Sequence, residues 1–239
     1  MSAMRIDFGG ETVIVTGGTG ALGGAVVQGF LDAGARVLAT YVVEAEVAPF
    51  RKRFAGQAER VALQRCDLRR AGEVSALFER VAPDSLRAVV NLAGGYTWTR
   101  VADADDAALE HLLDLNLRTT FTVCRAAATV LTAAGGGAIV NVSARAALRG
   151  EAGNGVYGAT KAAVLALTQS LSAELKDSGV NINAVLPSII DTPANRAAMP
   201  NSDPGNWVAP AALANVIVFL ASGDAAAIHG AGIPVYGLA

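Results

Sequence analysis

Thr12-Val-Ile-Val-Thr-Gly-Gly-Thr-Gly-Ala-Leu-Gly23 is the stretch that decides the fold. Its first five residues are a β-branched run typical of a strand, and an amphipathic segment follows the glycines as far as Ala33. Glycines let backbone N–H groups approach a pyrophosphate closely at a helix N-terminus, where the helix dipole favours negative charge. A strand, a glycine turn and a helix in this order therefore predict a dinucleotide site. Its expected contacts are Gly17, Thr19, Gly20, Ala21, Leu22 and Gly23.

The same alternation of short apolar runs and helical patterns continues along the chain. Short connections between strands and helices imply a parallel, doubly wound sheet with helices on both faces, so we expect one α/β domain over residues 1–239. Residues 187–209 read as an irregular loop over the substrate. The predicted strands are 12–16, 34–41, 60–64, 86–92, 137–142, 180–186 and 233–236, and the later predicted helices are 44–55, 107–134, 156–178 and 210–222.

Composition excludes several classes of partner. The chain has 239 residues and a formal net charge of −2, which gives no electrostatic reason to expect nucleic acid or an anionic membrane. No apolar run approaches the ~18 residues of a membrane span, and we expect a soluble cytoplasmic protein. Cys66 and Cys124 lie far apart without metal-ligand spacing, which predicts free thiols and no metal site.

The form of the dinucleotide depends on the end of the second strand. A carboxylate there would bind the adenosine ribose hydroxyls, but Tyr41 stands at that place and Thr40 precedes it. Both NAD and NADP remain open, and the missing carboxylate favours NADP. After the third strand, Asp67 can reach an adenine amine or form a turn or helix cap, and Leu68 follows it.

Tyr157 and Lys161 lie four residues apart, one turn apart on the same face of a predicted helix. A neighbouring cation favours the phenolate and lowers a tyrosine pKa toward the range of an acid–base catalyst. For an isolated pair, a buried tyrosine beside a solvated lysine is the commoner explanation. Asn116, in the middle of the helical pattern 107–134, is either a satisfied core amide or a deliberate polar group.

Several motifs that occur in a fixed order make a catalytic role for Tyr157 and Lys161 the better explanation. The glycine turn, Asn91-Leu-Ala-Gly94, Asn116, Asn-Val-Ser at 141–143, Tyr157 with Lys161, and Pro187 followed by Thr192 together resemble the short-chain dehydrogenase/reductase family, over essentially the whole chain. The resemblance implies a Rossmann fold and NAD(P)-dependent hydride transfer. It also implies that Tyr157 is the acid/base, that Lys161 binds the nicotinamide ribose and lowers the tyrosine pKa, and that Asn116 holds a proton-relay water. The further residues expected along the cofactor are Asn91, Ala93, Gly94, Pro187, Ile189 and Thr192.

One departure concerns the serine of that family. It usually lies 13 residues before the tyrosine, where this chain has Ala144, and Ser143 lies 14 before it. Either Ser143 replaces the missing serine by a one-residue shift, or Ala144 occupies the place and Ser143 points elsewhere. We favour the second reading, because the stretch from Ala144 to Tyr157 resembles the dihydropteridine reductase branch of the family without a gap. A shift would also reverse the side-chain direction at a strand end, where neighbours face opposite ways.

From about Ala144 to Pro210 the chain is similar to dihydropteridine reductases. The likeness includes Ala144-Arg145-Ala-Ala-Leu148, and a further Ala-Gly-Gly-aromatic turn occurs at residues 93–96. It implies a substrate region containing Tyr96, Trp98, Arg145 and Trp207, where a pterin-like ring could stack on an aromatic side chain. Ordinary packing is the simpler explanation for any single aromatic.

The sequence thus predicts an NAD(P)-dependent oxidoreductase acting on a small carbonyl or alcohol, or on a pterin-like ring. The alternatives are a dihydropteridine reductase proper and a non-catalytic protein that senses dinucleotide redox state. The partners expected are a small-molecule substrate and further copies of the chain. A homodimer or homotetramer would form through the helices around Leu113–Leu131 and Ala162–Leu175.

Overall fold

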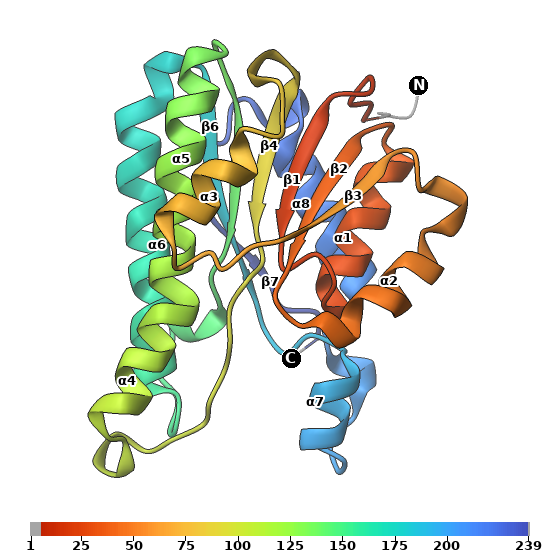
Figure 1. Cartoon of the computed structure of the whole chain (residues 1–239). Helices are drawn as coiled ribbons and strands as arrows, with labels where there is room; N and C mark the ends of the chain where they lie inside the picture. The colour runs from red at the N-terminus through yellow and green to blue at the C-terminus, as the bar shows by residue number, and fades with distance from the viewer. Residues whose placement is uncertain (1–5, 239) are drawn as a thin grey trace.

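The computed structural model describes residues 6–238, and in it seven strands form one parallel sheet (Figure 1). The strand order is β3-β2-β1-β4-β5-β6-β7, which confirms the predicted doubly wound α/β fold. The strands are β1 Thr12–Thr16, β2 Arg36–Tyr41, β3 Val61–Arg65, β4 Leu86–Asn91, β5 Gly137–Val142, β6 Val180–Pro187 and β7 Gly232–Val235.

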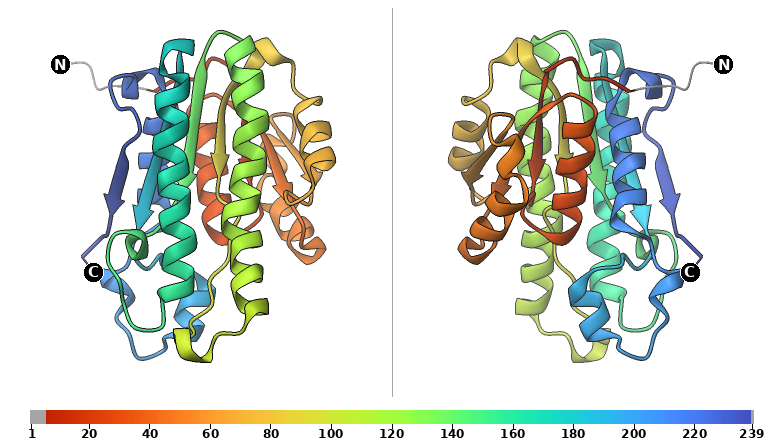
Figure 2. Two further views of the ribbon diagram at one scale, coloured as in Figure 1. Left: turned by 90° about the vertical axis from the view of Figure 1, so that its left-hand side faces the viewer. Right: turned by 90° about the vertical axis from the view of Figure 1, so that its right-hand side faces the viewer.

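Helices cover both faces of this sheet (Figure 2). Because strand side chains alternate, Val13 and Val15 of β1 pack into the core beneath α1 and α8, whereas Ile14 packs beneath α3 and α5. This two-sided burial explains why the strands read as nearly continuous apolar runs. The helices are α1 Ala21–Asp32, α2 Val47–Arg53, α3 Ala71–Phe78, α5 Thr119–Ala133, α6 Gly155–Leu175 and α8 Pro210–Ala221.

The strand order reverses at β1, which is flanked by β2 and β4. In parallel sheets the crevice for a ligand opens at the carboxyl ends of the strands, at such a reversal. Two short helices, α4 (Asp106–Leu112) and α7 (Pro193–Ala198), extend beyond this edge on opposite sides of the view in Figure 1. They flank the part of the molecule where the predicted site residues lie.

The long helix predicted over 107–134 is confirmed as α4 and α5 joined by one π-helical turn, Leu113–Arg118. Asn116 lies inside this turn and is completely buried. An extra residue in a helical turn bends the backbone and turns a side chain out of the regular pattern, and such turns are frequent at functional sites.

Two parts of the chain differ from the prediction. The sequence did not predict α3, which is short and contains Gly72 in its first turn. The predicted irregular loop over 187–209 contains α7 and a 3₁₀ turn at Pro204–Asn206. α7 begins where the Thr192 side chain accepts the N–H of Asn195 and Pro193 occupies the first helical position. Within residues 6–238, no helix is long and apolar enough to cross a membrane.

Candidate active site

A cavity of about 430 Å³ opens at the carboxyl edge of the sheet. It is bordered by the segments that follow β4 and β5, by the first turns of α6, and by the chain between β6 and α7. The predicted site residues that line it are Tyr96, Trp98, Ser143, Arg145, Tyr157, Lys161, Pro187 and Ile189. Asn116, Thr192 and Trp207 do not line it.

Tyr157 and Lys161 lie on the same face of α6, as the spacing predicted. The ammonium Nζ is 5.9 Å from the centre of the Tyr157 ring and donates to the backbone carbonyl of Val142 at 2.9 Å. Lys161 is buried, whereas Tyr157 is partly exposed to the cavity. The lysine is therefore held in place by the end of β5, beside the phenol.

The pKa of Tyr157 moves in the direction opposite to the prediction. Burial raises the pKa of the phenol, and the neighbouring phenol of Tyr96 raises it further. Burial also lowers the pKa of Lys161 to about 8. Desolvation of the phenol decides the direction of the shift in this structure, and a lowering of the tyrosine pKa by Lys161 stays a prediction.

The Asn116 side chain is fully occupied by the protein. Its Oδ1 accepts the N–H of Gly95 at 3.0 Å, and its Nδ2 donates to the Gly95 carbonyl at 3.0 Å and to Thr160 Oγ1 at 3.1 Å. Of the two readings of this residue, the structure supports a satisfied core amide. It fastens the chain after β4 to the first turns of α6, and it leaves no side-chain donor for a relay water.

Ser143 and Ala144 face different surroundings. The Ser143 hydroxyl is buried and donates to the backbone carbonyl of Lys161 at 2.7 Å. Ala144 lines the cavity with extended backbone, at φ −162° and ψ 161°. This arrangement supports the reading in which Ala144 occupies the place of the serine and Ser143 points elsewhere.

The glycine turn has a conformation that only glycines can adopt. Gly17 has φ +62°, and a Cβ at Gly23 would lie 2.3 Å from the carbonyl oxygen of Gly17. Thr40 supports the turn, because its buried hydroxyl accepts the N–H of Gly17 at 3.2 Å. The Thr40 hydroxyl thus has a partner within the protein, and a direct contact of Thr40 with the cofactor stays a prediction.

The turn and the end of β4 fit a dinucleotide. The N-terminus of α1 has no side-chain cap and no acidic residue in its first turn, so the N–H groups of Ala21, Leu22 and Gly23 face a position suited to an anion. A Cβ on Gly94 would meet Asn116 Oδ1 at 2.7 Å and Lys161 Nζ at 3.3 Å. Position 94 therefore has no room for a side chain between Asn116 and the lysine.

The end of β4 carries a further polar group without a partner. Among the described residues, Asn91 Oδ1 is the buried side-chain atom that lacks a hydrogen bond, although its Nδ2 donates to Asn141 at 2.8 Å. A buried acceptor of this kind calls for an explanation, and a ligand at this edge is one. Ala93, two residues on, is held by Thr16, whose hydroxyl accepts its N–H at 3.2 Å.

Sequence reasoning missed one residue at the glycine turn. Glu46, beyond β2, accepts a hydrogen bond from the Thr19 hydroxyl. Its carboxylate is partly exposed and lies between the glycine turn and the end of β2, where Tyr41 stands and where the adenosine ribose of a dinucleotide fold binds. Glu46 reaches this position because the 3₁₀ turn Glu44–Glu46 after β2 packs beside the glycine turn. No local sequence pattern predicted this contact.

Four other predicted cofactor residues, Asp67, Leu68, Ile189 and Thr192, make contacts within the protein, and their contact with the cofactor stays a prediction. Asp67 binds Arg69 and Arg70 and caps a turn through the N–H of Arg69, and these contacts lower the pKa of its carboxyl to about 2. Leu68 is buried in the core beneath α3 and α5. The carbonyl of Ile189 accepts the N–H of Val208, and Thr192 caps α7.

The substrate residues are only partly brought together. Tyr96 and Trp98 line the cavity and are 56% and 59% exposed. Arg145 also lines it and pairs with Glu151 at 3.1 Å. Trp207 is buried and does not line the cavity, which fits ordinary packing, and its contact with a substrate stays a prediction.

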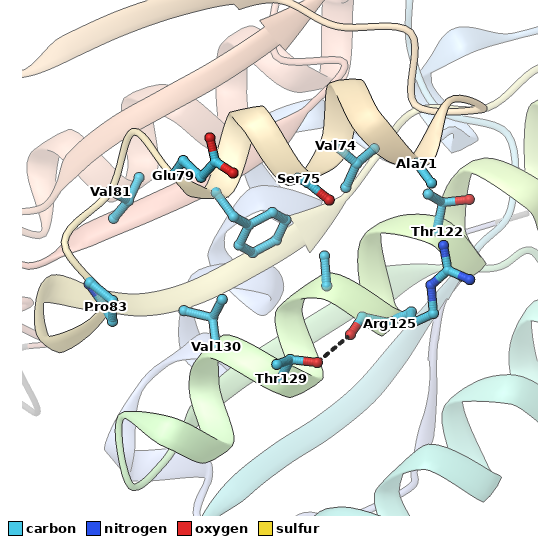
Figure 3. A pocket seen from close by; sticks show the side chains of 12 residues that line it. Ala71, Val74, Ser75, Glu79, Val81, Pro83, Thr122, Arg125, Thr129 and Val130 are labelled. Carbon is cyan, nitrogen blue, oxygen red and sulfur yellow. Dashed lines mark hydrogen bonds between the residues drawn. The ribbon is translucent and has the colours of Figure 1, made fainter.

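A larger cavity, of about 600 Å³, lies elsewhere, between α3 and α5 (Figure 3). Its lining includes Val74, Val130, Glu79 and Arg125, and Thr129 bonds to the Arg125 carbonyl at 3.3 Å. The described residues contain no cluster of histidine, cysteine and carboxylate groups that could hold a metal ion, here or elsewhere. The Tyr157–Lys161 pair lines the smaller cavity.

Comparison with known proteins identifies the family. A family model described as short chain dehydrogenase matches residues 11–203. The chain is 32% identical to a sorbitol dehydrogenase of Cereibacter sphaeroides over 79% of this chain and 73% of that protein. It is 30% identical to a D-threitol dehydrogenase of Mycolicibacterium smegmatis over 98% of this chain and 93% of that protein.

A solved structure gives the same answer. A short chain dehydrogenase/reductase family protein superposes with a TM-score of 0.87 and 32% identity, over 98% of both chains. Since the family model spans most of the chain and these relatives are dehydrogenases, the protein belongs to the short-chain dehydrogenase/reductase family and is an NAD(P)-dependent oxidoreductase.

Proposed function

We propose that this oxidoreductase interconverts a secondary alcohol of a small polyhydroxylated compound and the corresponding ketone. The relatives described above are named for sorbitol and D-threitol, both polyols. The cavity also suits such a compound, because Tyr96 and Trp98 offer flat apolar faces while Glu151 and Asn154 offer acceptors for hydroxyl groups.

One observation carries the proposal. Tyr157 and Lys161 share one face of α6 and line the same cavity, next to a glycine turn with an uncapped helix N-terminus. In this proposal Tyr157 exchanges a proton with the substrate oxygen, and Lys161 binds the ribose of the nicotinamide half. The nicotinamide cofactor accepts or supplies the hydride. The glycine turn and the first turn of α1 bind its pyrophosphate.

The proton chemistry depends on pH in a defined direction. Because burial raises the pKa of Tyr157, its phenol is protonated at neutral pH and is ready to act as an acid. Reduction of a ketone requires this acid form, so we expect reduction to proceed at neutral pH. Oxidation of the alcohol requires the phenolate as a base, and its rate should rise as pH increases above neutrality.

The test is a spectrophotometric screen with both NAD and NADP. Reduction of the oxidised cofactors is measured with a panel of polyols and sugars, and oxidation of the reduced cofactors with simple ketones, ketoses and quinonoid dihydropterin. Tyr157→Phe keeps the ring and should lower turnover by a factor of ~10² to 10⁴ while cofactor affinity persists. A variant that retains more than roughly a tenth of wild-type activity would show that Tyr157 is not the acid/base.

The pterin-like ring remains a second candidate substrate. Two exposed aromatic side chains at the mouth of the cavity, Tyr96 and Trp98, are the observation that favours it. Turnover of quinonoid dihydropterin without turnover of any polyol or ketose in the same screen would select this candidate.

We also propose that copies of the chain associate through the exposed sides of α5 and α6. Phe121 on α5 is 45% exposed, with the guanidinium of Arg125 5.5 Å from its ring centre. Light scattering after size-exclusion chromatography would give the mass, and a monomer at micromolar concentration would contradict the proposal.

A further inference from the structure

The cavity holds few hydroxyl groups that are free to act on a substrate. Four hydroxyl-bearing side chains line it: Tyr96, Ser143, Tyr157 and Ser188. Ser143 donates its proton to the carbonyl of Lys161 at 2.7 Å, and Ser188 donates to the carbonyl of Tyr236 at 2.7 Å. Each serine hydroxyl is thereby directed into the protein backbone, which leaves the two phenols.

The two phenols are in contact. The rings of Tyr96 and Tyr157 have their centres 4.9 Å apart and stand at 88° to each other. This edge-to-face arrangement is a favoured one for aromatic pairs. The Tyr96 ring therefore packs directly against the side chain to which we assign the proton transfer.

Hydrogen bonds on either side fix the position of Tyr96, one set at the backbone before it and one at its hydroxyl. Its main chain follows Gly95, whose N–H and carbonyl both bind Asn116. Its hydroxyl donates to Asn154 Oδ1 at 2.9 Å, and Asn154 in turn donates to Glu151 at 3.1 Å. Tyr96 is 56% exposed, so this outer hydrogen bond can be exchanged for one to a ligand in the cavity without leaving a buried group unpaired.

The other donors around the cavity are less suited. The Lys161 ammonium is bound to the Val142 carbonyl, and Asn195 Nδ2 donates to the carbonyl of Ile190 at 2.8 Å. The guanidinium of Arg145 binds Glu151 and lies 5.9 Å from the centre of the Tyr236 ring, on the side of the C-terminal segment. It is the Tyr96 ring that packs on Tyr157, whereas Arg145 lies over Tyr236.

We propose that Tyr96 supplies the second hydrogen bond to the reacting oxygen of the substrate, in the place left without a hydroxyl by Ala144. The inference rests on the proposed function. During reduction the hydride adds to the carbonyl carbon, Tyr157 gives its proton to the oxygen, and Tyr96 stabilises the charge that develops there. Tyr96 keeps its own proton throughout. The substrate therefore gains one hydride from the reduced cofactor and one proton from Tyr157. The role makes Tyr96 a catalytic residue of this chain.

The test uses four proteins: the wild type, Tyr96→Phe, Ala144→Ser and the double variant. Tyr96→Phe preserves the ring packed on Tyr157 and removes only the hydroxyl. We expect its kcat to fall on the order of 10²-fold, the scale for loss of one donor to a developing oxyanion, with KM changed much less. Ala144→Ser alone should change kcat little, because one donor is already present. In the double variant, a serine hydroxyl at the lining position 144 should recover most of the lost kcat.

Rescue by Ala144→Ser distinguishes a hydrogen-bond donor role of Tyr96 from a purely structural one. A serine at 144 can donate a hydrogen bond to the substrate, but it cannot replace the ring packing of Tyr96 or its bond to Asn154. Trp98→Phe is the comparison variant: it changes an apolar face of the same cavity and removes no hydroxyl, so Ala144→Ser should not restore whatever activity it loses. Tyr96→Phe with kcat within threefold of wild type would overturn the inference. So would a large loss in Tyr96→Phe that Ala144→Ser does not restore. A wild type that turns over no compound of the screen would instead contradict the proposed function, and the inference with it.

Discussion

The cofactor side and the substrate side of the cavity are built on different principles. At the glycine turn, backbone geometry imposes the residue types: Gly17 has a positive φ, and Gly23 has no room for a Cβ. On the substrate side, side chains pair with one another, as Arg145 does with Glu151 and Tyr96 with Asn154. The first kind of site tolerates little change, whereas the second can be rebuilt for another substrate without disturbing the sheet.

The largest effect is expected where the two sides meet, at Lys161. Burial lowers its pKa from 10.5 to about 8, so between these values the unfolded chain binds more protons than the folded one. The contribution of Lys161 to stability should therefore rise with pH from about 8 to 10.5, by roughly 3 kcal/mol at the scale of 1.36 kcal/mol per pKa unit. Cys66 and Cys124, whose pKa values burial raises, act in the opposite direction in the upper part of this window.

Lys161→Met removes this titration, and its stability should rise less steeply over the same window. The measurement is denaturant unfolding of both proteins at several pH values, with the slopes compared rather than the absolute stabilities. Parallel slopes in the two proteins would show that the burial of Lys161 has no such cost.

The next largest effect is expected from Gly23→Ala, which should distort the glycine turn and weaken cofactor binding. The new Cβ would lie 2.3 Å from the Gly17 carbonyl oxygen and 2.6 Å from Gly18, so the turn must shift. Overpacking of this kind costs roughly 1–3 kcal/mol, and we expect cofactor affinity to fall about 10- to 100-fold.

Gly72→Ala is the control, because a Cβ there would meet nothing within 4 Å and Gly72 lies in α3, outside the predicted cofactor contacts. Cofactor titration by quenching of protein fluorescence gives both affinities. If the two variants bind equally well, the turn is less rigid than the structure implies.

A smaller effect is expected from Glu46→Gln, which sharpens the choice between NAD and NADP. The Glu46 carboxylate, bound to Thr19, would repel the 2′-phosphate of NADP at the ribose site. Tyr41, at the end of β2, carries no negative charge of its own. We expect the ratio of kcat/KM for NADPH to that for NADH to rise by roughly fivefold to tenfold, the scale of one like-charge contact near the surface.

Glu44→Gln serves as the control, because Glu44 is a neighbouring exposed carboxylate and it is Glu46 that binds Thr19 of the glycine turn. Steady-state kinetics with both cofactors measure the ratio. An unchanged ratio in Glu46→Gln would place Glu46 outside the ribose site.

The smallest effect concerns Ser143→Ala. The hydroxyl is bound to the Lys161 carbonyl and directed away from the cavity, so kcat should stay within about twofold of wild type while stability falls by ~1 kcal/mol for the lost hydrogen bond. Steady-state kinetics and thermal unfolding measure the two quantities. A loss of kcat on the order of 10²-fold would show instead that the Ser143 hydroxyl takes part in catalysis.

Local patterns in the chain determined much of this protein. Because strand and helix periods, glycine turns and a Tyr–Lys pair one helical turn apart are short-range features, they predicted the doubly wound sheet, the dinucleotide turn and the shared face of Tyr157 and Lys161. The helical pattern over 107–134 also marked Asn116 as an interruption, which the structure contains as a π-helical turn.

The tertiary structure alone decided which side chains meet. Thr19 and Glu46 are 27 residues apart in sequence and Tyr96 and Asn154 are 58 apart, yet each pair is hydrogen-bonded. Such contacts depend on how the segments beyond the strands are packed at the carboxyl edge of the sheet, which no local pattern specifies. The same packing buries Tyr157 enough to raise its pKa and turns the Ser143 hydroxyl into the backbone of α6, because desolvation and side-chain direction are properties of the assembled fold.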